Sequence, residues 1–469
     1  MDYLTFNTST SPNEEFSDTS RSTGGKLQEV KLKHIHVTSE VKVVKKNYGL
    51  EEAIYGLVVG CLYSLIACLG RNEFGLDTLT NFASTVKNYK DEFLNGITTF
   101  VDSGGYSIIK GDVSPINIDR FLGCYIAYFE YANDAYDKIF SLDIPFSLMH
   151  HELNRKELIY KYNIESMSKQ LEVLERKPEL LDKLYFVWHF KLKSLYGIWK
   201  QLVSELELNK VIRNRAIGGM VSLRILNREI NFSPFTGIAF RCLYDYLLSG
   251  YFDSGFRLHF LGINLPYDRL HIAFLEKLFR KLAQGHEIEH TYDTINYSQG
   301  SRMNSSLSLY DFTPNNELIY YDNISEIPFE LVKNIYKDEK LINEITEEIQ
   351  RRINGKRLKS INSFIPLNIY SNLSLDTFFE KIIDEYEMVD VLIGSSSTSV
   401  VESKFKSINN ELSEKYPSLF NKDMVVNLVE NMEYTWTYCD WFLNDRSDER
   451  LDYHINRFVE CIGFDEILT

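Results

Sequence analysis

Three aspartates far apart in the chain end short apolar runs, and this placement is the strongest chemical feature of the sequence. They are Asp102, Asp143 and Asp293. A carboxylate at the end of a buried strand stands where a pocket can form, so it can exchange protons or attack an electrophile. Asp102 opens an Asp-Ser-Gly-Gly-Tyr segment at residues 102–106, whose paired glycines let the backbone approach a planar ligand closely. Taken alone, that segment fits a strand-to-loop turn with an aspartate cap equally well.

A second pattern, His-Glu-Ile-Glu-His at residues 286–290, matches the zinc-protease motif in letters only. That motif binds zinc when both histidines share one helical face and a third ligand follows. Gly285 directly before it is a normal helix C-cap, and residues 291–295 read as a strand. We therefore predict a helix-to-strand loop here. The Gly-Ser-rich segment 394–399 lacks the Lys-Ser/Thr end of a phosphate loop and predicts a polar linker.

The elements that must position the aspartates alternate regularly. Apolar runs that predict strands cover residues 97–101, 139–144, 184–189, 216–221, 258–263 and 291–295. Amphipathic stretches that predict helices cover residues 118–135, 165–174, 196–206 and 270–283. This alternation predicts parallel βα units, for which a (β/α)8 barrel fits better than an open sheet, although sequence separates the two poorly. In such a barrel, catalytic groups come from the carboxyl ends of several strands.

The two ends of the chain predict different structure. Residues 1–28 are rich in Ser, Thr, Asn and acidic residues and predict a disordered tail that is not a signal peptide. We assign residues 29–327 to the α/β barrel, with a hairpin arm at 317–322. From 328 to 469 the pattern is mainly helical, including amphipathic stretches at 331–353 and 375–386.

Composition excludes several classes of protein. With 44% apolar and 25% charged residues among 469, the chain has the balance of a soluble globular protein and not of a disordered or multi-span membrane protein. Residues 53–70 carry no charge, but 18 residues are marginal for a span, and a buried strand-turn-helix or core helix is expected. Six scattered cysteines without a Cys-x-x-Cys pair favour a reducing cytoplasm over a disulfide framework.

Five short motifs resemble, in the same order, those of the tRNA-guanine transglycosylases. The 102–106 segment is similar to the family's Asp-Ser-Gly-Gly-Phe, and Ser-Leu-Asp-Ile-Pro at 141–145 to its second aspartate strand. Ala-Ile-Gly-Gly-Met-Val at 216–221 resembles its Ala-Ile-Gly-Gly-Leu, and 259–263 the strand before its nucleophile. Residues 293–297, with Arg302 beyond, resemble the nucleophile strand, and the hairpin at 312–319 also matches. The resemblance covers roughly residues 96–325 and implies a modified (β/α)8 TIM barrel.

The family exchanges guanine in a polynucleotide for a 7-deazaguanine base, which explains a need for several carboxylates. The resemblance implies that Asp293 attacks the sugar anomeric carbon and forms a covalent intermediate. Asp102 would be the general acid and base, and Asp143 would accept hydrogen bonds from the guanine edge. The base-binding residues implied are Ser103, Gly104, Tyr106, Asp143, His189, Gly218 and Gly219. His189 stands where the family usually has glutamine, so its base-reading role competes with a structural one. Tyr106 replaces the family's phenylalanine and is expected to stack on the base. No cofactor or metal is implied.

Two departures from the tRNA enzymes favour a different branch. Those enzymes carry a Cys-x-Cys-x-x-Cys…His zinc site after the last barrel strand, whereas this chain has no cysteine between Cys242 and Cys439. They also end in a β-rich RNA-binding domain. The branch that fits is the DNA guanine transglycosylases of phage and bacterial 7-deazaguanine DNA-modification systems, which insert bases such as preQ0 into DNA. A tRNA enzyme without zinc, a base-releasing hydrolase and a non-enzymatic binding protein are the alternatives.

A DNA partner must be reconciled with the charge of the chain. Lys plus Arg is 51 and Asp plus Glu is 66, a formal charge of −15, so binding must use local basic patches. The candidates are Lys42, Lys45, Lys46, Arg213, Arg215, Arg224, Arg302, Arg351, Arg352, Lys356, Arg357 and Lys359. A solvated face is the alternative for each cluster. The target base must be flipped out or presented single-stranded. We expect a cytoplasmic protein without membrane contact, and a homodimer is possible.

Overall fold

The fold is taken from a computed structural model. It describes residues 34–38, 60–64, 83–84, 87–88, 91, 98–189, 193–211, 213–219, 233–250, 255–263, 265–294, 309–356 and 364–460. The predicted tail over residues 1–28 lies outside these ranges. Of the uncharged segment 53–70, residues 60–64 are described and form a strand, as the strand-turn-helix interpretation expects.

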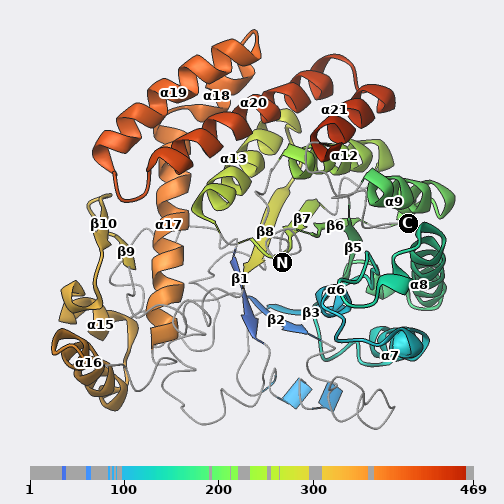
Figure 1. Cartoon of the computed structure of the whole chain (residues 1–469), viewed down its shortest axis with the longest axis horizontal. Helices are drawn as coiled ribbons and strands as arrows, with labels where there is room; N and C mark the ends of the chain where they lie inside the picture. The colour runs from blue at the N-terminus through green and yellow to red at the C-terminus, as the bar shows by residue number, and fades with distance from the viewer. Residues whose placement is uncertain are drawn as a thin grey trace.

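A parallel, curled β-sheet forms the centre of the molecule (Figure 1). Six of its strands are β3 (Thr98–Asp102), β4 (Lys138–Phe140), β5 (Leu184–Trp188), β6 (Asn214–Ile217), β7 (Phe256–Phe260) and β8 (Ile288–Thr294). Two short strands, β1 (His34–Thr38) and β2 (Gly60–Ser64), pair with each other, with β8 and with β3. The predicted α/β class is therefore confirmed, with neighbouring strands parallel and in chain order.

Aromatic side chains fill the concave side of this sheet. Phe100, Phe140, Tyr185 and His259 come from four different strands, and the ring centroids of Phe140 and His259 lie 4.7 Å apart. Those of Phe100 and Phe140 lie 5.9 Å apart. Residues two apart in a strand share a face, so Asp102 lies on the same face as Phe100, one layer nearer the carboxyl ends of the strands. The packed rings thus form the floor beneath the aspartates.

Helices follow the strands as the alternation predicts. Those of the first part of the chain are α6 (Gly105–Ile109), α7 (Ile118–Tyr131), α8 (Lys156–Arg176), α9 (Lys193–Glu205), α10 (Leu208–Val211), α12 (Ser233–Ser249) and α13 (Pro266–Leu282). Single 3-10 turns are η1 (Pro115–Asn117), η2 (His151–Leu153) and η3 (Pro178–Leu180). The expected strand ends were shifted: β6 and β7 stop at residues 217 and 260, because Gly219 and Gly262 beyond them take left-handed φ angles of 101° and 77°.

The second part of the chain is a hairpin followed by helices, as predicted. Strands β9 (Leu309–Phe312) and β10 (Leu318–Tyr321) pair antiparallel, and η5 (Ile324–Glu326) follows. The helices are α15 (Phe329–Ile335), α16 (Glu339–Ile353), α17 (Ile365–Glu385), α18 (Met388–Ile393), α19 (Thr398–Lys415), α20 (Lys422–Asn444) and α21 (Asp448–Glu460). The stretch 331–353 is two helices, because the Asp338 carboxylate accepts the backbone N–H of Leu341 at 2.9 Å and caps a new one.

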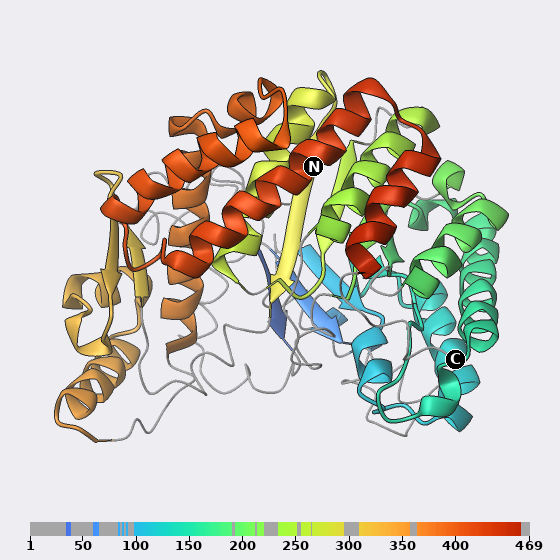
Figure 2. The same ribbon diagram turned by 45° about the horizontal axis from the view of Figure 1, so that its top comes forward.

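The C-terminal helices pack directly on the helices of the α/β part. In Figure 2, α20 and α21 cross over α12 and α13. A Cβ atom added to Gly237 of α12 would lie 2.7 Å from the ring of Tyr438 in α20, so this contact requires glycine. The prediction of a linker at 394–399 was wrong. Ser395 is 7% exposed and its carbonyl accepts the Trp436 indole N–H at 2.9 Å, so the segment is a short loop within one packed layer.

Residues 286–290 form the turn into β8, as predicted. Gly285 has a φ of 86°, and the strand begins at Ile288, so His286 and His290 do not share a helix. The His290 ring is buried among phenylalanines, with that of Phe279 5.3 Å away. Within the described ranges, no group of three or more His, Cys, Asp or Glu side chains could hold a metal ion. No helix in the described part of the chain is long and apolar enough to cross a bilayer.

Candidate active site

Asp102 ends β3, and the turn that follows returns a hydrogen bond to it. Gly104 has a φ of 96°, which favours glycine, and its backbone N–H donates to Asp102 Oδ1 at 3.2 Å. The Asp-Ser-Gly-Gly sequence therefore ends the strand and starts α6 within two residues. The Asp102 side chain is left partly buried above the aromatic floor.

The Asp102 carboxyl group holds its proton unusually well. Burial raises its pKa from 3.8 to about 7, the Gly104 N–H opposes this, and the negative charges of Asp293 and Asp143 raise the pKa further. Carboxylates must be close to one another to act in this way. The structure thus brings together the three aspartates that the sequence separates by up to 191 positions, since 293 − 102 = 191. A carboxyl group with a pKa near neutral can both give and take a proton at physiological pH.

Asp143 lies three residues beyond β4 and is held on three sides. The Ser103 hydroxyl donates to its Oδ1 at 3.4 Å, and His189 Nε2 contacts its Oδ2. A Cβ atom added to Gly105 would lie 2.9 Å from the same Oδ2, so the first turn of α6 touches the carboxylate through bare backbone. Asn163 of α8 fixes the segment by bonding both backbone groups of Ile144, at 2.9 and 2.8 Å.

His189 follows β5 and joins the base-binding residues predicted from sequence. Its ring packs edge-on against Trp199 with centroids 5.5 Å apart, and it is buried. A Cβ atom added to Gly218, which follows β6, would lie 2.8 Å from the His189 ring. Ser103, Asp143, His189 and Gly218 therefore form one contact cluster beside Asp102. The base-reading role of His189 stays a prediction, because contact with Asp143 fits a structural role equally well.

Asp293, on β8, is oriented by two hydrogen bonds to a single oxygen. The Gly262 N–H donates to Oδ1 at 2.9 Å, and His259 Nε2 lies 3.1 Å from the same atom. The other ring nitrogen of His259, Nδ1, lies 2.8 Å from Thr291 Oγ1, which fixes the ring. Oδ1 is thus held by β7 and by the turn that follows it.

His259 was not among the functional residues predicted from the sequence. It was considered only as the first residue of the 259–263 motif, although its place in the strand register puts it beside Asp293. In register, His259 of β7 pairs with Thr291 of β8, two residues before Asp293 and on the same face. A buried histidine one strand away from a candidate nucleophile could be recognised only after the strand register was known.

Two other residues predicted for the base pocket follow strands β6 and β3. Gly219 follows Gly218 at the end of β6. Tyr106, in α6, is 36% exposed and its ring lies 5.2 Å from the Lys110 ammonium. Stacking of Tyr106 on a base stays a prediction.

Burial contradicts the phosphate contact predicted for Arg215, whereas that of Arg213 stays a prediction. Arg215 is 3% exposed and its charge acts on Asp245 and Cys242, because alternate residues of β6 point outward to α12. Arg213 pairs with Asp182 at 3.1 Å and precedes β6, at the end of the sheet opposite Gly218. Lys356 is exposed just beyond α16. Arg302 and Arg357, like Lys42, Lys45, Lys46, Arg224 and Lys359, lie outside the described residues.

Comparison with known proteins adds no assignment. No model of a known protein family matches the chain, and a search of curated proteins found no match. The features that bear on function are therefore the ordered motifs and the arrangement of the three aspartates, each in a different environment. Two are held by histidines, and the third has a pKa near neutral.

Replacing Gly105 with alanine tests the cluster around Asp143. The new methyl group would displace the Asp143 carboxylate, so we expect free-base affinity to fall at least ~10-fold, the loss of one charged hydrogen bond. Calorimetric titration with guanine measures this. Gly197→Ala is the matched control, because a Cβ atom there meets nothing within 4 Å. Equal affinity in the two variants would contradict the placement of Asp143 in the base pocket.

Proposed function

We propose that the chain is a DNA guanine transglycosylase on a modified (β/α)8 TIM barrel, which exchanges guanine in DNA for a free 7-deazaguanine base such as preQ0. One observation carries the proposal. Asp102, with a pKa of about 7, lies beside two further carboxylates. One is Asp293, which hydrogen bonding to a single oxygen orients as a nucleophile, and the other is Asp143, which accepts the hydroxyl hydrogen bond of Ser103. The pairing of β1 with β8 supports the barrel, since it joins the two ends of the sheet.

In the first half-reaction, Asp293 Oδ2 forms a bond to the C1′ atom of the target nucleotide as the C1′–N9 bond breaks. The electron pair of that bond leaves with guanine, and the Asp102 carboxyl group supplies the proton that makes the leaving base neutral. Gly262 N–H and His259 hold Asp293 Oδ1 throughout, which keeps Oδ2 aimed at the sugar.

In the second half-reaction, the Asp102 carboxylate takes the N9 proton of the incoming 7-deazaguanine. The N9 electron pair then bonds to C1′, and Asp293 leaves as a carboxylate. Both protons pass through one group, whose pKa of about 7 makes the transfer easy in either direction. Asp143 accepts hydrogen bonds from the ring N–H and exocyclic amine that guanine and 7-deazaguanine share.

DNA as the acceptor rests on the departures of this sequence from the tRNA enzymes. The chain has no cysteine between Cys242 and Cys439, and its C-terminal region is helical. The target nucleotide must leave the duplex to expose C1′, at a cost of a few kcal/mol unless it is already single-stranded. A cytoplasmic location, without membrane contact, fits this substrate, and a homodimer is compatible with it.

Labelled preQ0 tests the proposal directly. The purified chain is incubated with the base and with single-stranded DNA, duplex DNA or tRNA, and Asp293→Asn serves as the inactive control. We expect label in DNA, most rapidly in single strands. Label in tRNA alone would contradict the proposal, and release of free guanine without incorporation would identify a hydrolase. Binding of nucleic acid with neither outcome would indicate a binding protein.

A further inference from the structure

Three buried polar side chains join β8 to two helices directly behind the candidate nucleophile. The Tyr292 hydroxyl lies 2.8 and 2.6 Å from the two carboxylate oxygens of Asp376 in α17. Arg269 of α13 donates through Nε to the Tyr292 hydroxyl at 2.9 Å and through Nη2 to Asp376 Oδ1 at 2.8 Å. Arg269 also donates to the side chain and carbonyl of Asn372. None of these groups takes part in the proposed chemistry.

Tyr292 is the residue next to Asp293, so the two side chains point to opposite faces of β8. Asp293 faces the site, and Tyr292 faces the helices. Burying an ion pair costs desolvation free energy, which further hydrogen bonds to its remaining polar groups help to offset. Here Arg269 and Asp376 each hydrogen-bond to more than one partner. The Tyr292 hydroxyl therefore attaches β8 to a rigid, fully bonded pair.

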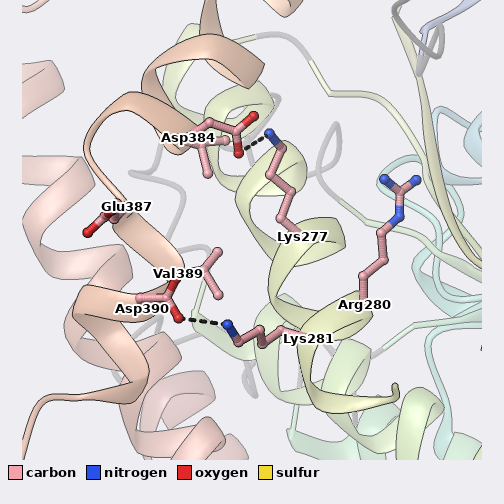
Figure 3. A pocket seen from close by; sticks show the side chains of 8 residues that line it. Lys277, Arg280, Lys281, Asp384, Glu387, Val389 and Asp390 are labelled. Carbon is pink, nitrogen blue, oxygen red and sulfur yellow. Dashed lines mark ion pairs between the residues drawn. The ribbon is translucent and has the colours of Figure 1, made fainter. Parts of the chain in front are cut away.

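Helix α17 is itself fixed at other points. Tyr370 donates its hydroxyl to Asp311 of the β9–β10 hairpin at 2.7 Å, and Ser371 Oγ accepts the Tyr310 N–H at 2.9 Å. Farther along, Lys277 of α13 pairs with Asp384 at 2.6 Å. Lys281 pairs with Asp390 of α18 at 2.9 Å, and Figure 3 shows both pairs across the cleft between these helices. A displacement of α17 relative to α13 would break the Lys277–Asp384 pair together with the bonds from Arg269 to α17.

We propose that Tyr292, held by Asp376 and Arg269, is a positioning residue that sets the place of Asp293 in the site. The C-terminal helical region is then part of the catalytic unit, because α17 supplies Asp376. This inference rests on the proposed function of Asp293 as nucleophile. A nucleophile displaced by less than 1 Å loses much of its rate, since attack requires the reacting atoms at near-contact distance and in line.

Tyr292→Phe removes the attaching hydroxyl and keeps the ring. We expect the single-turnover rate of adduct formation at saturating DNA to fall ~10-fold or more, with the KM for the base changed less than ~2-fold. Tyr370→Phe is the matched control. It removes a tyrosine hydroxyl from α17 that contacts the β9–β10 hairpin instead of β8, and it should change neither constant more than ~2-fold. If Tyr292→Phe does not fold, Asp376→Asn replaces it, with the same expectation.

Hydrogen exchange supplies a readout that does not depend on catalysis. Amide groups of 288–294 should exchange faster in Tyr292→Phe than in the wild type, and no faster in Tyr370→Phe. A wild-type adduct rate in Tyr292→Phe, equal losses in both variants, or unchanged exchange in β8 would overturn the inference. A wild-type protein that forms no adduct with any acceptor would instead overturn the proposed function, while exchange would still decide whether Tyr292 holds β8.

Discussion

Asp293→Asn is expected to abolish the covalent enzyme–sugar adduct and to lower base exchange by on the order of 10⁴-fold or more, as loss of a nucleophile does in other covalent enzymes. An amide oxygen is a far weaker nucleophile than a carboxylate. The fold should persist, because asparagine has the same shape and its Oδ1 still accepts the Gly262 N–H. Adduct formation is measured with end-labelled DNA on a denaturing gel, and exchange with labelled base.

Asp311→Asn is the control for this substitution. Asp311 is also partly buried and hydrogen-bonded, but it lies in the hairpin, bound to Tyr370. We expect its exchange rate to stay within ~2-fold of wild type, as is usual for a change away from the reacting groups. Normal exchange by Asp293→Asn would show that the nucleophile assignment is wrong. Loss of exchange in both variants would point to a general effect on folding.

Asp102→Asn is expected to lower turnover ~10²- to 10⁴-fold, the contribution of a general acid or base. Binding of the free base should persist, because Ser103, His189 and Gly218 still surround Asp143. In the wild type, the exchange rate should depend on a group with a pKa of about 7. A pH profile measured with saturating substrates compares the two proteins, and an unchanged profile in Asp102→Asn would remove Asp102 from the proton transfers.

The same substitution is expected to stabilise the folded protein at high pH. The pKa of Asp102 is raised from 3.8 to about 7, so between these values the folded chain keeps a proton that the unfolded chain has lost. Wild-type stability therefore falls as pH rises from about 4 to about 7, by on the order of a few kcal/mol. Asparagine has no proton to lose, so Asp102→Asn should exceed wild type in urea unfolding at pH 8 and match it near pH 4. An equal difference at both pH values would contradict the raised pKa.

The order of strands and helices, and the residue types at the strand ends, could be predicted from local patterns in the sequence. Apolar runs such as 184–189 alternate with amphipathic stretches such as 118–135, and each periodicity depends on residues that are neighbours in the chain. The helical character of the C-terminal region was predictable for the same reason. The ordered motifs also named Asp102, Asp143 and Asp293 before any distance was known.

Which side chains come into contact could be learned only from the folded chain. Adjacent residues of a strand face opposite sides of the sheet. Asp293 therefore lies in the site while its neighbour Tyr292 lies among the helices, and Arg215 is buried instead of exposed. His259 and Asp376 acquire their roles from partners on other elements, as many as 107 positions away for Arg269 and Asp376. Such contacts leave no local pattern, because their energy comes from burial and hydrogen bonding between segments that only the folded chain brings together.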